Sequence, residues 1–273
     1  MISNKEWVYK DTTIIIDTHC HLDSEQYNED INEVLNKASS EGIEKIIIPG
    51  ADINDLEKAV MLSEIHPQIY FSVGIHPYHI DQYDEEYLCK FITHPKCVAI
   101  GECGLDYFRL PEDEEEKKQN IALQKKIFIA QIDLAKRYNK PLIIHIRDAS
   151  NDSKALLIQN NAKEVGGVLH CFNADEQLLS LSDHGFYFGI GGVLTFKNGK
   201  KLKNVLSKIP QDKLVIETDA PYLTPEPFRG KRNEPSYTTY VADMMSEILE
   251  IPRCTIEHLT TQNANKLFFE KIA

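Results

Sequence analysis

The amino-acid sequence predicts an α/β protein built as a single (β/α)8 TIM barrel, and three observations support this fold class. Eight short apolar or β-branched runs lie along the chain, and each is nearly continuous, as in parallel strands buried on both faces. Helix-like stretches separate these runs, which is typical of a parallel sheet with crossover helices. The length of 273 residues suits one barrel of roughly 250 residues, although about 150 residues per domain would suggest two domains. An open doubly wound sheet is the competing architecture, because the pattern alone does not exclude it.

The predicted elements follow a polar lead of residues 1–13. In chain order, the eight predicted strands are residues 13–16, 45–48, 70–73, 97–100, 142–144, 167–169, 186–188 and 214–216. The clearest predicted helix covers residues 121–138, where Gln124, Phe128 and Gln131 share one stripe. The charged residues 113–118 precede it and are interpreted as a solvated helix start. Because no Pro/Gly/Ser-rich linker divides the chain, residues 1–273 are expected to form one domain.

Composition restricts the classes of function. The chain has 30 Lys and Arg against 42 Asp and Glu, a formal net charge of −12, which argues against coating nucleic acid by bulk charge but allows a local basic patch. The apolar runs are far shorter than the ~20 residues that cross a bilayer, so no membrane segment is expected. The polar lead lacks the apolar core of a secretory signal. Six cysteines without a C-x-x-C pair argue against a disulfide framework and favour the cytoplasm.

Histidines and carboxylates follow the predicted strands at the point where each strand ends. His19 and His21 lie two positions apart after the first strand, so both can point the same way and hold one metal ion. In a barrel these strand ends converge on one face, where active sites lie. Structural histidines have no reason to gather at the same end of several strands, so the sequence predicts a metal site. Its candidate ligands are His19, His21, Glu102, His145, His170 and Asp219.

The other histidines give weaker signals. His76 also follows a strand and is interpreted either as a substrate contact or as a structural residue. His66 and His94 each precede a proline just ahead of a strand, which places them on the opposite face. His184 precedes a glycine at a predicted helix C-terminus, and His258 lies in a C-terminal helical pattern. These last four are interpreted as structural.

Several of these segments match the signature blocks of a known family. The blocks are DTHCHLD (residues 17–23), GECGLDY (101–107), HIRDA (145–149), HCF (170–172) and ETDAPYLTP (217–225). Further matches are GIHP (74–77), NEP (233–235) and NANKLF (263–268). These blocks follow one another along the chain as they do in the TatD family of metal-dependent deoxyribonucleases, which the chain resembles between residues 14 and 269. The resemblance implies a (β/α)8 barrel of the amidohydrolase type, a dinuclear divalent-metal site and hydrolysis of phosphodiester bonds.

The resemblance also implies a role for each candidate ligand. One metal ion would be bound by His19, His21, Glu102 and Asp219, and the other by Glu102, His145 and His170. Glu102 would bridge them, since a carboxylate with two oxygens reduces the repulsion between cations ~3.5–4 Å apart. Asp219 would also accept the proton of the attacking water as general base. Mixed imidazole and carboxylate ligands suit Zn²⁺, Mn²⁺ or Co²⁺, whereas the family is usually assayed with Mg²⁺ or Mn²⁺, so the native ion stays open.

Carboxylates and cysteines flank the candidate ligands. The carboxylates are interpreted either as groups that orient the ligands or as simple turn residues, and they are Asp17, Asp106 and Asp148. The cysteines are interpreted as small buried residues pointing away from the site, and they are Cys20, Cys103 and Cys171.

Two basic segments provide candidates for substrate binding. Residues 197–201 and 229–232 follow the last two predicted strands, where many barrels bind phosphate. Arg229 and Lys231 are the candidate phosphate contacts, with a solubilising loop as the alternative interpretation.

Aromatic residues on the same face extend this prediction. Tyr107, Phe108 and Tyr222 could stack unpaired bases, which favours single-stranded ends of DNA. The longer polar lead and the acidic segment of residues 109–118 depart from the family pattern, and they leave the substrate preference open.

The predicted function is therefore a divalent-metal-dependent 3′→5′ exodeoxyribonuclease that acts on single-stranded ends, without a membrane or an obligate protein partner. Two alternatives stay open. One is an amidohydrolase-type enzyme acting on a small amide or ester, and the other is a non-catalytic metal-binding barrel. Many dinuclear members of the wider amidohydrolase group use a carboxylated lysine on the fourth strand as the bridge, so Glu102 favours the nuclease branch.

Overall fold

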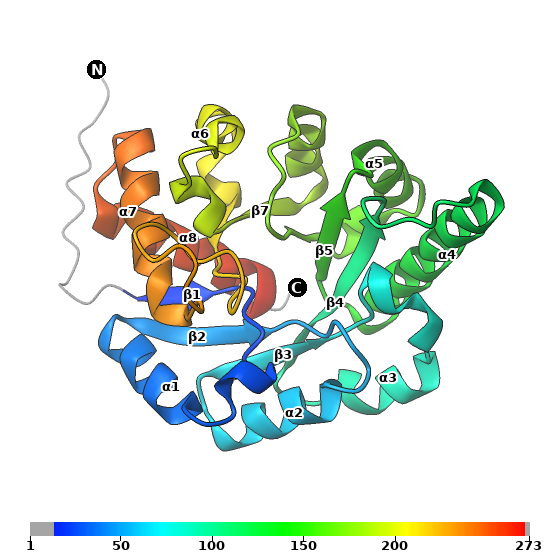
Figure 1. Ribbon diagram of the computed structural model, residues 1–273, viewed down its shortest axis with the longest axis horizontal. Helices are drawn as coiled ribbons and strands as arrows, with labels where there is room; N and C mark the ends of the chain where they lie inside the picture. The colour runs from blue at the N-terminus through cyan, green and yellow to red at the C-terminus, as the bar shows by residue number, and fades with distance from the viewer. Residues whose placement is uncertain (1–13, 271–273) are drawn as a thin grey trace.

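The computed structural model describes residues 14–270, and they form a (β/α)8 barrel, which confirms the predicted fold class. Eight parallel strands make one sheet in the order β1 to β8, and the helices surround it in chain order (Figure 1). The strands are β1 (Ile15–Asp17), β2 (Ile43–Ile48), β3 (Ile69–Val73), β4 (Cys97–Asp106), β5 (Leu142–Arg147), β6 (Gly167–Leu169), β7 (Phe186–Ile190) and β8 (Leu214–Ile216). The polar lead and Thr13 of the first predicted strand lie outside the described residues.

The helices lie on the outside of the sheet. They are α1 (Ile31–Ser40), α2 (Leu56–Ile65), α3 (Glu85–Ile92), α4 (Glu114–Tyr138), α5 (Ser150–Gln159), α6 (Lys200–Leu206), α7 (Thr238–Leu249) and α8 (Arg253–Phe268). Shorter 3₁₀ helices are η1 (Glu25–Tyr27), η2 (Pro77–Gln82), η3 (Ala162–Glu164), η4 (Glu176–His184), η5 (Gly192–Thr195), η6 (Gln211–Lys213) and η7 (Pro235–Tyr237). Within residues 14–270, none of the helices combines the length and the hydropathy that crossing a bilayer requires.

Strands β8 and β1 meet just beyond their ends and close the barrel. The amide of Thr18 donates a hydrogen bond to the carbonyl of Ile216 (3.1 Å), and the amide of His21 donates to that of Ala220 (2.7 Å). Cys20 and Ala220 pair as a parallel bridge. The open doubly wound alternative is therefore wrong, because an open sheet leaves its edge strands unpaired.

The strands begin at one end of the barrel, which we call the lower end, and finish at the upper end. The lower half of the barrel interior is apolar and is sealed by α8. One buried cluster joins inward-facing strand residues to α8, and its members are Ile16, Ile47, Val98, Ala99, Ile143, Val168, Tyr187, Val215, Ala264, Leu267 and Phe268. Asn263 of α8 donates to the carbonyl of Leu214 (2.8 Å), where β8 begins. Helix α8 therefore closes the end of the barrel at which the strands begin, and it leaves the other end open for a site.

Strand β4 is longer than predicted, and this changes where Glu102 lies. The predicted strand ends at residue 100, but β4 continues to Asp106, with an irregular register between Ile100 and Cys103. Gly101 has a φ of +142°, and a Cβ there would lie 2.3 Å from the carbonyl oxygen of Ile143. Only glycine fits such a close approach at positive φ. The irregularity keeps Glu102 inside the strand while pairing with β5 resumes after it.

Helix α4 holds two strand ends in place. The sequence predicts a solvated helix start at residues 113–118. Asp113 caps α4 there by accepting hydrogen bonds from the amides of Glu115 and Glu116 (both 3.0 Å). Buried Gln131 donates to the carbonyl of Ile75 (3.0 Å) and accepts from its amide (2.8 Å). Gln124 makes the same pair of bonds with Asp106 (both 2.9 Å). These two pairs of hydrogen bonds fix the chain just beyond β3 and at the end of β4, beside the candidate site.

Candidate metal centre

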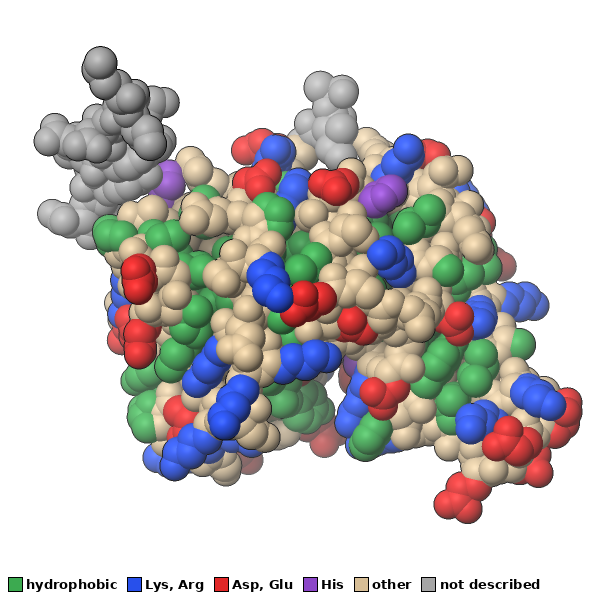
Figure 2. Space-filling model, turned by 90° about the horizontal axis from the view of Figure 1, so that it is seen from above, with side chains coloured by type: hydrophobic (Ala, Val, Ile, Leu, Met, Phe, Trp, Pro, Cys, Tyr) green, Lys and Arg blue, Asp and Glu red, His purple; other side chains and the backbone are tan. Residues whose placement is uncertain are grey.

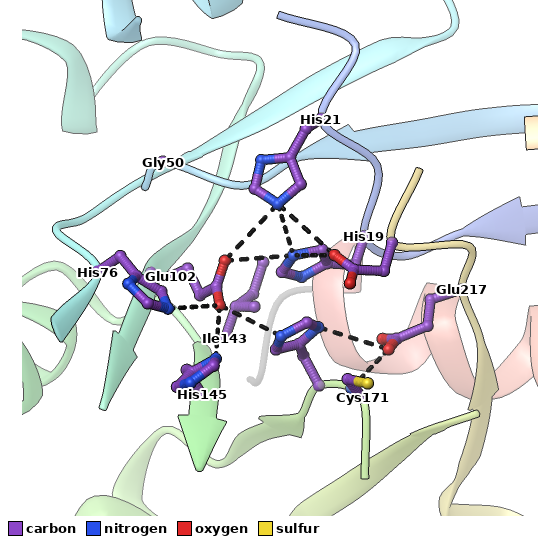
Figure 3. Close-up of polar contacts among 12 residues, drawn as sticks. His19, His21, Gly50, His76, Glu102, Ile143, His145, Cys171 and Glu217 are labelled. Carbon is purple, nitrogen blue, oxygen red and sulfur yellow. Dashed lines mark hydrogen bonds and ion pairs between the residues drawn. The ribbon is translucent and has the colours of Figure 1, made fainter. Parts of the chain in front are cut away.

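Glu102 lies at the centre of the predicted site, among histidines from four strand ends (Figure 3). Its side chain is almost fully buried inside the upper end of the barrel. Figure 3 shows His21 on one side of the carboxylate and His76 with His145 on the other. The structure therefore brings together side chains that are far apart in the sequence.

One oxygen of Glu102 faces the residues that follow β1. Its Oε2 lies 3.3 Å from Nε2 of His19 and 3.8 Å from Nε2 of His21. Oδ1 of Asp219 lies 3.6 Å from each of the same two nitrogens. The two imidazole nitrogens are themselves 3.3 Å apart. These four residues thus direct their ligand atoms at one small volume.

The other oxygen of Glu102 faces a second set of imidazoles. Oε1 lies 3.0 Å from Nδ1 of His145 and 3.2 Å from Nε2 of His170. Nε2 of His76 is 3.5 Å away. Among the described residues, three groups have ligand atoms within 4.8 Å of one another: His19, His170 and Asp219; His19, His21 and Glu102; and His76, Glu102 and His145.

Two of these histidines have a carboxylate behind the ring. Oδ2 of Asp106 lies 2.9 Å from Nε2 of His145, on the side away from Glu102. Oε1 of Glu217 lies 3.4 Å from Nδ1 of His170 and accepts a hydrogen bond from the amide of Cys171. A carboxylate behind an imidazole fixes its tautomer and orientation, and this is the usual setting of a metal-binding histidine.

Glu217 is a functional candidate that sequence reasoning missed. It follows the apolar strand β8 directly and is fully buried, which its sequence context does not reveal. A Cβ at position 189 would lie 2.2 Å from Oε2 of Glu217, so Gly189 on β7 provides the space for this carboxylate. The only sequence signal is a glycine inside an apolar strand, which often marks a close approach.

Asp17 acts on the backbone rather than on an imidazole. Its carboxylate accepts from the amide of His19 (3.3 Å) and from the amide (3.0 Å) and hydroxyl (2.6 Å) of Thr218. Burial raises the pKa of Asp17 to about 8, although these hydrogen bonds oppose the shift. Asp17 therefore joins the residues after β1 to those after β8.

Burial and charge leave neutral imidazoles beside an ionised carboxylate. Burial lowers the pKa of His21 to about 3, and the neighbouring His19 acts in the same direction. Burial also lowers the pKa of His76 to about 3, against the opposing effect of Glu102. For Glu102 itself, burial acts to raise the pKa, but His170, His76 and His19 hold it well below its usual range.

The carboxylates have the opposite effect on the second set of histidines. Burial acts to lower the pKa of His145 and of His170, but the carboxylates beside them raise both above the ordinary value. Burial raises the pKa of Asp219 to about 6, with His170 and His19 opposing the shift. A bound cation replaces protons on ligands of this kind, because a metal needs deprotonated donors.

These residues fit a divalent metal centre. The donor set is mixed imidazole and carboxylate, which suits Zn²⁺, Mn²⁺ or Co²⁺. His19 and His21 bring two nitrogens together beside two carboxylates, and a shared cation would stabilise that arrangement. Glu102 offers one anionic oxygen to each set of donors.

A pocket of about 520 Å³ opens above these residues, and its wall includes His145, His170, Asp219 and Tyr222. In Figure 2 a hollow in the lower edge of the molecule has Lys and Arg side chains on both sides. Tyr222 is 56% exposed and presents its ring to this pocket. The centre is thus open to solvent on the side of the strand ends.

The predicted phosphate contacts lie on the loop after β8. Arg229 is exposed, and its guanidinium carbon lies 3.7 Å from the ring centroid of Phe196. Lys231 is also exposed, with its Nζ 5.4 Å from the Phe228 ring. Their neighbour Arg232 differs, because both of its terminal nitrogens bond to Asp30 (2.9 and 2.6 Å).

One interpretation from the sequence is wrong, and the structure shows the surroundings of two further residues. Cys171 is half-buried and lines the pocket, because a positive φ of 43° turns the chain there instead of continuing a strand. Asp148 is exposed and forms no hydrogen bond or ion pair with a candidate ligand among residues 14–270. Tyr107 is half-buried and its hydroxyl donates to Asp152 (2.8 Å), so its ring forms part of a wall. By contrast, Cys20 and Cys103 are fully buried, as expected.

The four histidines interpreted as structural lie away from the centre. His66 ends α2 ahead of β3, and His94 accepts from the amide of Lys96 (3.1 Å) ahead of β4. His184 ends η4 before Gly185, which has a positive φ of 83°. His258 lies in α8.

Comparison with known proteins agrees with the signature blocks. Residues 16–269 match the family described as TatD related DNase. The chain is 43% identical to the uncharacterized metal-dependent hydrolase YabD of Bacillus subtilis (strain 168), over 93% of this chain and 99% of that protein. It is 32% identical to the 3′-5′ ssDNA/RNA exonuclease TatD of Escherichia fergusonii, over 93% of this chain and 98% of that protein. The crystal structure of YJJV, a TatD homolog from Escherichia coli K12, has a TM-score of 0.85 and 29% identity and covers 93% of this chain and 97% of its own. The chain therefore belongs to the TatD family of metal-dependent hydrolases.

Proposed function

We propose that the protein is a deoxyribonuclease that removes nucleotides in the 3′→5′ direction from single-stranded DNA ends, using two divalent cations. The observation that carries the proposal is the position of Glu102. One of its oxygens faces His19 and His21, and the other faces His145 and His170 (3.0–3.8 Å). A carboxylate shared between two donor sets is what a two-metal hydrolytic site requires.

The donor sets assign the residues that would hold the cations. His19, His21, Asp219 and Oε2 of Glu102 would hold one, and His145, His170 and Oε1 of Glu102 the other. When bound, Mg²⁺, Mn²⁺, Zn²⁺ or Co²⁺ would supply Lewis acidity that activates water and stabilises charge on phosphodiester oxygens. Asp106 and Glu217 would orient His145 and His170 from behind.

Asp219 is the proposed general base. Its carboxylate borders the pocket, and burial raises its pKa to about 6 before any cation binds. A base whose pKa lies near the working pH is the most effective proton acceptor. Asp219 would therefore receive the proton of the attacking water.

His76 is better suited to the substrate than to a cation. Its Nδ1 accepts a hydrogen bond from the amide of Tyr78 (3.1 Å), and its pKa of about 3 keeps the ring neutral. In a neutral imidazole that accepts at Nδ1, the proton is on Nε2. Nε2 of His76 would thus donate to a phosphoryl oxygen.

The loop after β8 would bind the rest of the substrate. Arg229 and Lys231 lie over aromatic rings and form no ion pair within residues 14–270, so their charges are free for phosphate. Tyr222 would stack on an unpaired base, while Tyr107 would contribute only to the pocket wall. An acidic chain could in this way attract phosphate at one place.

The substrate assignment draws on the family description and on the relative named as a 3′-5′ ssDNA/RNA exonuclease. We place the reaction in the cytoplasm, because all six cysteines are free thiols, which is typical of a reducing compartment. No obligate protein partner enters the proposal.

Digestion of a single-stranded oligonucleotide labelled at either end tests the proposal. With Mn²⁺ or Mg²⁺ we expect stepwise loss from the 3′ end, and EDTA should abolish it. Asp219→Asn should keep the fold and lose turnover by about 10²–10⁴-fold, the usual contribution of a general base. Asp212→Asn, at an exposed position at the opposite end of the barrel, is the matched control and should retain full activity.

Two results would refute the proposal. Hydrolysis of an amide or carboxylic ester, but of no phosphodiester, by the metal-loaded protein would favour the amidohydrolase alternative. Full activity of Asp219→Asn would remove the assigned base.

A further inference from the structure

The arginines of the chain divide into two kinds. Arg137, Arg232 and Arg253 each pair with a carboxylate within 3.0 Å. Arg109, Arg147 and Arg229 form no ion pair with residues 14–270 and instead lie over the rings of Tyr78, Phe108 and Phe196, at 5.2, 3.6 and 3.7 Å. A guanidinium stacked on a ring keeps its in-plane N–H groups available for an anion.

The stacked arginines all lie at or just beyond strand ends, at the open end of the barrel. Arg109 lies after β4, Arg147 is the last residue of β5, and Arg229 lies after β8. The paired arginines mostly hold helices or loops, such as Arg137 of α4 with Glu85 of α3 (2.8 Å). Free guanidinium groups therefore concentrate where the substrate would enter.

Arg147 is distinctive because it borders two adjoining pockets. One is the pocket of about 520 Å³ above the metal centre. The other, about 550 Å³, lies over the loops after β5 and β6, and its wall includes Tyr107, Ser150, Asn151 and Asn173. Ile146, Arg147, Asn173 and Lys201 line both pockets, so a molecule could extend from one into the other.

The second pocket has the chemistry of an anion site with a polar wall. Arg147 and the exposed Lys201 form no ion pair within 4.0 Å among the described residues. Of the nearby carboxylates, Asp152 is neutralised by Lys125 (2.7 Å) and by the Tyr107 hydroxyl. Asp175 accepts from the amide (3.3 Å) and the side chain (2.7 Å) of Gln177. Asp148 and Asp175 are the remaining negative groups of this wall, and Lys201 is close enough to act electrostatically on Asp175.

An exposed aromatic ring completes the surface. Phe108 is 57% exposed, and the guanidinium carbon of Arg147 lies 3.6 Å from its ring centroid. The ring packs against Arg147, which lines both pockets, and bases stack well on aromatic rings and on guanidinium planes. A base in a duplex is already stacked on both faces, so this ring would favour an unpaired one.

We infer that the pocket over the loops after β5 and β6 binds the nucleotide adjoining the scissile phosphodiester. Arg147 and Lys201 contact its phosphate, and Phe108 stacks on its base. The inference rests on the proposed function and gives it a substrate class, an unpaired strand of at least two nucleotides. It also implies substrate contacts outside the basic loop after β8.

The test compares a long and a short substrate. Wild-type protein loaded with Mn²⁺ is assayed for kcat/KM on tetrameric oligothymidylate and on the p-nitrophenyl ester of thymidine 5′-phosphate, which has one nucleotide and offers the second pocket neither a second phosphate nor a second base. Arg147→Ala and Phe108→Ala should each lower kcat/KM on the tetramer about tenfold more than on the ester, the usual size of a phosphate or stacking contact. Arg137→Ala, a paired arginine on the outer helices, is the matched control and should change neither value.

Lys201→Ala and a salt titration sharpen the test. Each lost phosphate contact should flatten the dependence of log KM on log salt by about 0.7 for a single strand. Equal losses on both substrates, or no loss from Phe108→Ala, would overturn the subsite. Cleavage of the ester but not of the tetramer by wild-type protein would overturn the subsite and leave phosphodiester hydrolysis standing. Cleavage of neither substrate would refute the proposed function, and this inference with it.

Discussion

The two ends of the barrel interior differ, although the same strands line both. Near the strand starts, Ile16, Val98 and Val215 pack against Phe268 of α8 in a sealed apolar cluster. Near the strand ends, the buried side chains are His19, Glu102, His170 and Glu217. Burial of apolar surface stabilises a fold, whereas burial of charged groups costs free energy unless they have partners. Burial of apolar surface at the lower end therefore offsets the cost of burying charged groups at the upper end.

The largest expected effect is the loss of the shared carboxylate. Glu102→Gln keeps the shape of the side chain but removes the charge that faces both donor sets. Turnover should fall by about a thousandfold, because metal clamping contributes several kcal/mol and each 1.36 kcal/mol is tenfold in rate. Kinetics and the metal content of the purified protein measure this, and unchanged metal content with full turnover would contradict a bridging role.

Phe268→Ala tests the apolar end. The side chain of Phe268 is 7% exposed and belongs to the apolar cluster that α8 seals. Its truncation should lower the free energy of unfolding by about 3–5 kcal/mol, the usual cost of a large cavity. Denaturant unfolding measures the change, with Leu123→Ala on the exposed side of α4 as the control that should change little. Turnover of the folded protein should stay at the wild-type level, and a parallel loss of turnover would break the separation between the two ends.

Glu217→Gln should affect cation binding through His170. Removing a carboxylate behind a metal-binding histidine lowers metal affinity or activity by about 10–100-fold. Calorimetric titration with Mn²⁺ measures the affinity directly. Glu257→Gln is the matched control, because Glu257 is equally buried but pairs with Arg253 (2.7 Å) in α8. It should lower stability without changing cation affinity, and equal affinities in both variants would assign Glu217 a structural role only.

The smallest expected effect separates two neighbouring arginines. Arg229→Ala should weaken binding of single-stranded DNA and reduce the slope of log affinity against log salt by about 0.7, the value for one phosphate. Arg232→Ala breaks the pair with Asp30 and should lower stability while the slope stays the same. Fluorescence anisotropy at several salt concentrations distinguishes them, and identical slopes would end the phosphate assignment for Arg229.

Much of the fold and the candidate ligands can be predicted, because each depends on local sequence. Apolar runs such as residues 45–48 and 142–144 coincide with strands, since parallel strands buried on both faces need no alternation. His19, His145 and His170 could be grouped from sequence because strand ends converge in any barrel. The resemblance to the TatD family then implies a role for each.

What could not be predicted depends on long-range packing. Glu217 looks like any carboxylate after a strand, and only the space above Gly189 shows that it is buried against His170. The extension of β4 depends on a close approach of Gly101 to Ile143 that no single strand pattern contains. Cys171 was misassigned because a turn at positive φ reverses which side a residue faces. The stacking of Arg147 on Phe108 could not be predicted, because the ring comes from the loop after another strand.

The seal formed by α8 has a consequence for the order of synthesis. Thr261 of α8 donates to the carbonyl of Ile14, at the start of β1, so the first and last described elements hold each other (2.6 Å). On a ribosome, the eight strands emerge before the helix that covers their apolar lower end. An incomplete chain therefore exposes that surface during translation, when partly folded proteins are most prone to aggregate. Assistance from chaperones would matter most in the interval before α8 emerges.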